Sequence, residues 1–127
     1  MLVKKGKFYY LYDKENEEIK LEITNWKTPF GGEVYGKKDI VNMIVPENNN
    51  GLNLKNTLRQ IEDLVREDFG EYCKQPLKIS EINTLVRCEV KNKNLLIEKN
   101  EELTGSLCFR IYNFKGNWGI SVIFEKI

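Results

Sequence analysis

The sequence predicts an α+β fold, in which one long central helix packs on one face of an antiparallel β-sheet of about six to eight strands. Two observations lead to this prediction. The stretch Gly51–Cys73 repeats apolar residues at helical spacing, whereas the rest of the chain alternates with a period of two or is rich in turn formers. A helix with one apolar face needs an apolar surface to cover, and strands are the only such surface available. The apolar face consists of Leu54, Leu58, Ile61, Leu64, Val65, Phe69 and Tyr72.

Length and composition indicate a single domain that spans residues 1–127 and needs neither disulfide nor metal to build a core. A hydrophobic content of 41% and a charged content of 31% are typical of soluble globular proteins. The formal net charge of +1 produces no overall field that attracts nucleic acid or an anionic membrane. No apolar run is long enough to span a membrane, and Met1–Gly6 is not followed by the apolar stretch of a signal peptide.

The segments before the helix predict four strands. Lys7–Tyr12 and Glu18–Trp26 are expected to pair as an opening antiparallel hairpin. A short strand is expected at Glu33–Tyr35, inside a glycine-rich segment. A longer strand is expected at Asp39–Val45, and the helix that follows is expected to take Asn53 as its N-cap. The inward residues of the Asp39–Val45 strand are Val41, Met43 and Val45.

The segments after the helix, which we expect Gln75 and Pro76 to close, predict further strands. Asn83–Val90 has Val86, Cys88 and Val90 on one face, and Leu95–Glu98 is expected to pair back as a short strand. Lys99–Gly105 is expected to be a polar connection. The chain then closes with a hairpin formed by Ser106–Phe114 and Trp118–Lys126.

Several kinds of chemistry are excluded or disfavoured. The chain has no histidine, which rules out histidine-based triads, proton relays and zinc ligation within it. Its three cysteines, Cys73, Cys88 and Cys108, are widely spaced and odd in number, as expected for reduced thiols in the cytoplasm. The acids of the helix, including Glu67 and Glu71, are interpreted as solvated side chains rather than a catalytic or metal site. We therefore expect no catalytic residue, no metal and no cofactor.

Two groups of residues are candidates for binding a partner. The helix carries Glu67, Asp68 and Glu71 at its C-terminal end, where the helix dipole favours cations. Intrahelical ion pairs such as Glu62–Arg66 and Arg59–Asp63 are the simpler explanation, and an acidic end kept for a basic partner is the functional one. The second group is aromatic, and it either folds onto the sheet or anchors another protein. It consists of Trp26, Phe30 and Tyr35.

The order of elements resembles that of small cytosolic α+β families of bacteria that act as immunity proteins beside toxins. The resemblance rests on Ile79-Ser-Glu-Ile, a strand, an Asn-Lys-Asn turn, Glu101-Glu-Leu-Thr-Gly105 and a final hairpin that ends in Val122-Ile-Phe. The Lys, Asn, Glu and Ile-rich composition also resembles that of small accessory proteins of AT-rich bacteria and phages. Leu103-Thr-Gly105 stands where some of those families have an aromatic-Gly-His signature, so no functional residue is carried over.

The leading functional hypothesis is a non-enzymatic binding protein that inhibits or neutralises a protein partner with a basic contact surface. The alternative is an accessory protein of a phage or mobile element that binds a small molecule or nucleic acid, in a pocket between helix and sheet. An enzyme ranks third, because no catalytic motif is recognisable. The sequence fixes neither the partner nor the oligomeric state.

Overall fold

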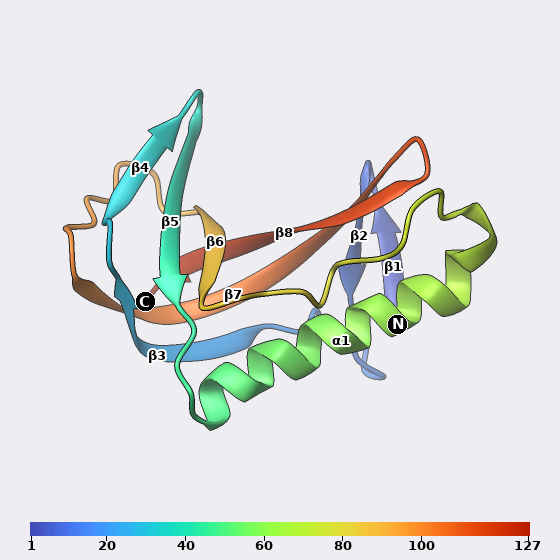
Figure 1. Ribbon diagram of the computed structural model, residues 1–127, viewed down its shortest axis with the longest axis horizontal. Coiled ribbons are helices and arrows are strands. Elements are labelled where there is room, and N and C mark those ends of the chain that lie inside the picture. Colours follow the sequence, from blue (N-terminus) through green and yellow to red (C-terminus); the bar gives the residue numbers. More distant parts are fainter.

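The computed structural model describes residues 1–127 as one eight-stranded sheet with a helix packed against it (Figure 1). This confirms the predicted α+β class. The strands are β1 (Leu2–Lys5), β2 (Phe8–Leu11), β3 (Leu21–Thr28), β4 (Gly32–Tyr35), β5 (Lys38–Ile44), β6 (Leu85–Val90), β7 (Glu101–Phe114) and β8 (Asn117–Lys126), and the helices are α1 (Asn49–Phe69) and the 3-10 helix η1 (Gly70–Tyr72).

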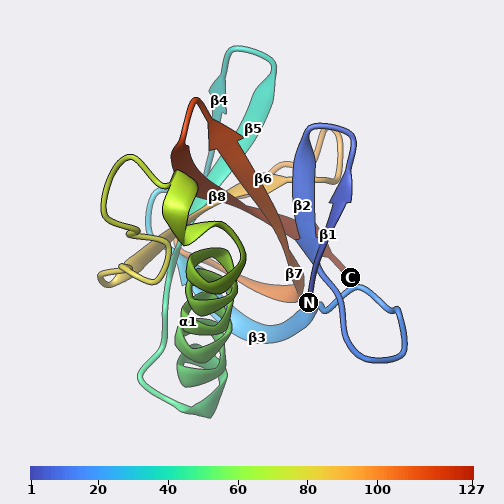
Figure 2. The same ribbon diagram turned by 90° about the vertical axis from the view of Figure 1, so that its right-hand side faces the viewer.

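The sheet is organised around β7, its longest strand. One edge of β7 pairs with β8 along the closing hairpin, and the other edge is shared by β3 on its first half and β2 on its second half. Beyond β8 the order continues through β6 and β5 to β4. All pairings are antiparallel except that of β6 with β8, which is parallel. The hairpins β1–β2 and β4–β5 therefore stand on opposite sides of the central strands (Figure 2).

The core lies between α1 and the sheet. The helix contributes Leu54, Leu58, Ile61 and Val65, none of which has any solvent-exposed surface, and this confirms the predicted packing face. The predicted inward residues of β5 and β6 are buried against them. They are Val41 and Met43 of β5, Val45 directly after it, and Val86, Cys88 and Val90 of β6.

Both ends of the helix differ from the prediction. The N-cap is Asn48 rather than Asn53, because the helix starts two residues before Gly51 and the Asn48 side chain accepts a hydrogen bond from the Gly51 amide at 3.0 Å. At the other end the α-helix stops at Phe69 and tightens into η1. This change of helix type turns Tyr72 into solvent, so Tyr72 does not belong to the apolar face.

Three predicted features of the strands are wrong. β2 and β3 do not form a hairpin, because β2 turns back on β1 and both β2 and β3 pair with β7. Residues 95–98 do not form a strand, although the Ile97 carbonyl accepts a hydrogen bond from the Gly32 amide at 2.9 Å and the Glu98 carbonyl accepts one from Thr28 Oγ1 at 3.4 Å. The predicted connection Lys99–Gly105 is largely the first part of β7, which pairs with β3.

A β-bulge in β3 explains why strict alternation fails there. Ile23 and Trp26 are three residues apart, yet both side chains are buried in the core. The register shifts between them, and Asn25 adopts a positive φ of 54° while its amide donates to Thr104 Oγ1 at 3.0 Å. The extra residue returns Trp26 to the core face.

Neither helix has the combination of length and apolar character that crossing a bilayer demands. The three cysteines are unpaired: Cys88 is buried, and Cys73 and Cys108 are half-buried.

Candidate functional site

Trp26 cannot anchor a partner in this structure, which corrects the prediction for that residue. Its side chain is only 1% exposed, and its indole Nε1 donates to Asn50 Oδ1 at 2.9 Å. Asn50 Oδ1 also accepts from the Thr24 amide at 3.1 Å, and Asn50 Nδ2 donates to the Glu22 carbonyl at 2.8 Å. Trp26 therefore belongs to the contact that holds the start of α1 on β3.

Phe30 and Tyr35, by contrast, are exposed by 57% and 55% of their surface. Two further apolar residues that the sequence analysis did not select lie in the same region, Val34 with 71% and Leu96 with 78% of its surface exposed. Val34 and Leu96 line one small cavity of about 110 Å³ between β4 and residues 95–97. We call Phe30, Val34, Tyr35 and Leu96, which lie on or beside β4, the β4 corner. Within it Val34 and Leu96 share the cavity, whereas the Tyr35 ring points to the other face of β4, toward Arg87.

The β4 corner includes a free stretch of sheet edge. β4 is the last strand in the sheet order, and the Tyr35–Lys38 pair closes its two-residue turn with β5. Alternate residues of an antiparallel strand bond to each side, so Gly32 and Val34 direct their backbone groups outward. The Gly32 amide is used by the Ile97 carbonyl, whereas the Val34 amide has no backbone partner beyond the edge. An extended segment of another chain can therefore hydrogen-bond at Val34.

The acidic residues Glu67, Asp68 and Glu71 lie far from this corner. They are exposed at the C-terminal end of α1, at the right of Figure 1, whereas the β4–β5 hairpin stands at the upper left. Arg66 pairs with Glu62 at 3.6 Å and Asp63 at 3.2 Å, and leaves the three acids without an ion pair. The structure therefore does not bring the predicted acidic and aromatic residues into one surface.

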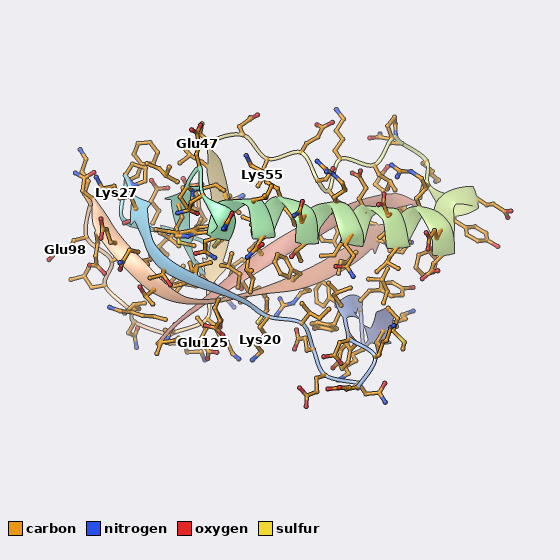
Figure 3. The ribbon with its side chains drawn as sticks, turned by 90° about the horizontal axis from the view of Figure 1, so that it is seen from below. Lys20, Lys27, Glu47, Lys55, Glu98 and Glu125 are labelled. Carbon is orange, nitrogen blue, oxygen red and sulfur yellow. The ribbon has the colours of Figure 1, made fainter.

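A groove that the sequence analysis missed crosses the sheet on the face opposite α1. It has a volume of about 360 Å³, and its walls include Tyr10 of β2 on one side and Lys38 of β5 on the other. Figure 3 shows Lys20, which lines it, on the side of the sheet away from α1. Three acidic side chains line this groove, those of Glu18, Asp39 and Glu89. The cationic side chains are twice as numerous: Lys20, Lys37, Lys38, Lys91, Lys93 and Arg110. We call this feature the basic groove.

A second hollow of about 200 Å³ continues the basic groove, because both are lined by Lys38 and Glu89. It adds Arg87 and Ser121 to the same face of the sheet. Neither Arg87 nor Arg110 has a carboxylate within ion-pairing distance. The alternation of β6 and β7 places both arginines on the outward face, and this is the signal that was available in the sequence.

The chemistry of these surfaces is that of binding. Cys108 lies on the floor of the basic groove, and burial, with a smaller effect of Glu18, raises the pKa of its thiol, which disfavours the nucleophilic thiolate. The pKa of Cys88 is raised still further by complete burial. No group of three or more cysteine and carboxylate side chains comes together in a way that could hold a metal ion.

Comparisons with known proteins gave no relative. No model of a protein family matches the chain, and no significant similarity was found to curated proteins or to solved structures.

Proposed function

We propose that the protein is a non-enzymatic binding protein that inhibits or neutralises a protein partner through the β4 corner. The observation that carries this proposal is the exposure of Val34 and Leu96 beside one small cavity at an edge strand, with Phe30 and Tyr35 also exposed near the two ends of that strand. Apolar side chains gathered on a surface favour association, because burying them removes apolar area from water. The three unpaired cysteines are consistent with action in the cytoplasm.

The partner that fits this corner best presents an extended segment with apolar side chains at alternate positions. Its backbone can bond to Val34, while its side chains contact Val34 and Leu96 on either side of the small cavity. At the other end of the strand order, β1 ends in exposed lysines, which discourage strand addition there. The expectation of a basic contact surface rests on the acidic end of α1 and does not belong to this corner.

The test uses a double variant in which Val34→Lys and Leu96→Lys place charges in the corner. Both side chains are largely exposed, so the fold should be retained. Partners are captured with the immobilised wild-type protein, and their dissociation rates from the wild type and from the double variant are then measured. We expect the double variant to accelerate dissociation by about tenfold or more, the range for residues at the centre of an interface.

A matched control raises the net charge by the same amount at the other end of the molecule, through Glu67→Gln and Glu71→Gln. The proposal requires that this control change the dissociation rate little. A partner that the corner variant binds as tightly as the wild type does, but that the control loses, would place the interface at the end of α1 and refute the proposal.

A further inference from the structure

We propose that the basic groove binds a phosphate-bearing ligand of about nucleotide size. The groove lies on the sheet face opposite α1, and its floor is formed by β7, β8 and β6. It meets the β4 corner only at Tyr35, whose ring stacks on Arg87, so the Val34 and Leu96 variants that test the protein partner leave the groove intact. It also relocates the small-molecule site expected between helix and sheet, where side chains of the core fill the space.

The charge of the groove favours an anion. Six cationic side chains face three acidic ones, although the chain as a whole is almost neutral. Lys38 pairs with Glu89 at 3.9 Å and Lys91 with Glu125 at 3.7 Å, while Lys20 and Arg110 have no ion pair. Cationic charge without partners in a hollow attracts an anion more strongly than the same charge spread over a convex surface.

The two arginines are positioned by the strand register. Arg110 of β7 lies opposite Ser121 of β8, and Arg87 of β6 falls beside the same serine, one position before the Cys88–Val122 pair. Neighbouring strands lie about 4.8 Å apart, so the two arginine backbones flank Ser121 at a separation of about 10 Å. Arginine binds phosphate oxygens through two parallel N–H groups, and a serine hydroxyl between two arginines adds a further donor.

Aromatic rings hold the guanidinium group of Arg110 at the basic groove and that of Arg87 at the hollow that continues it. Arg110 Cζ lies 4.8 Å from the centre of the Phe8 ring in the β1–β2 hairpin, and Arg87 Cζ lies 5.3 Å from that of Tyr35 in the β4–β5 hairpin. This stacking orders both side chains before any ligand arrives. Arg110 Nε is in addition buried with no hydrogen-bond partner, although such a donor is costly to leave unpaired.

The size and lining of the groove favour a nucleotide over a simple anion. Its volume of about 360 Å³ falls in the range of small-molecule sites, and Tyr10 and Ile123 supply surface on which a flat ring can rest beside the cations. The shared chemistry is the phosphate group, whether it comes from a free nucleotide or from a single-stranded nucleic acid lying between the two hairpins.

Protection of Cys108 from alkylation is the readout, because Cys108 lies in the groove and Cys73 lies outside it. Native protein is alkylated with and without ATP, pyrophosphate, a short single-stranded oligonucleotide or a hexaglutamate peptide, and each site is quantified by mass spectrometry. We expect ATP to slow alkylation at Cys108 several-fold and to leave Cys73 unchanged. Stronger protection by the oligonucleotide than by ATP would identify nucleic acid as the source of the phosphate.

Two variants test the arginines, and titration calorimetry measures ATP affinity. Arg110→Gln and Arg87→Gln should each weaken binding by about tenfold, as expected for loss of a charge-assisted pair of bonds. Lys55→Gln, which removes an exposed cation from α1 outside the groove, should leave the affinity unchanged. Arg87 is exposed and does not belong to the core, so its variant keeps the test valid if Arg110→Gln fails to fold. Absence of protection by every phosphate probe, or equal protection by hexaglutamate, would overturn the proposal.

Discussion

Replacement of Leu58 by alanine tests the packing of α1 on the sheet. Leu58 is fully buried at the middle of the helix. The substitution removes three carbon groups from the core, which costs about 2.4 kcal/mol at roughly 0.8 kcal/mol for each group. The cavity left by the missing atoms adds to this cost where the neighbouring side chains do not move in to fill it. The free energy of unfolding should therefore fall by about 2–5 kcal/mol. Ile61→Ala, at a site buried to the same degree, should fall in the same range.

The matched control is Leu52→Ala, the same substitution in the same helix at a side chain that is 52% exposed. It should change the free energy of unfolding by less than about 0.5 kcal/mol. Urea unfolding followed by circular dichroism measures both variants, and an unchanged slope against denaturant shows that only stability has altered. A loss below about 0.5 kcal/mol for Leu58→Ala, or equal losses at the two sites, would refute the assignment of this face to the core.

Three further predictions concern the ends of the helix and the thiols. Gly51→Ala should destabilise the fold by about 1–3 kcal/mol, since a Cβ there would collide with the Pro46 carbonyl oxygen. Gly70→Ala has open space around it and should stabilise the fold by up to about 1 kcal/mol. Thermal melts that shift in the same direction for both variants would contradict this. Asn50→Ala should cost about 1–3 kcal/mol because it leaves Trp26 Nε1 in the core without an acceptor, and a double-mutant cycle with Trp26→Phe should show coupling between the two sites rather than additive losses. Intact-mass analysis after alkylation of the unfolded, unreduced protein should find three modified thiols, and fewer than three would indicate a disulfide. In the native protein, burial and the raised pKa of the Cys88 thiol should keep that site unmodified.

The helix and most strands could be predicted because their side-chain periodicity is local. The same local signal fails where pairing over long distances decides the structure. Gly105 has the appearance of a loop residue, yet it lies within β7 and pairs with both β3 and β8. Glycine is needed there because a Cβ would collide with the Glu125 carbonyl oxygen. Trp26 follows a bulge that the alternation of β3 does not reveal.

The candidate surfaces were harder to predict than the fold for the same reason. The sequence left open whether Phe30 and Tyr35 fold onto the sheet or stay exposed, and the structure leaves both exposed. The position of Leu96 beside Val34 depends on the path of residues 95–97 next to β4, which no local pattern predicts. The pairing of Arg87 and Arg110 across Ser121 depends on the parallel register of β6 and β8, which no short-range pattern encodes.

Hydrogen exchange at the Val34 amide tests most directly whether a partner binds at the β4 corner. In the free protein this edge amide has no backbone acceptor and should exchange rapidly. In a complex with the captured partner, addition of a strand at β4 should slow its exchange, while the amides of Glu67 and Glu71 at the end of α1 should be unaffected. Slowed exchange near Glu67 and Glu71, with Val34 unchanged, would contradict the account.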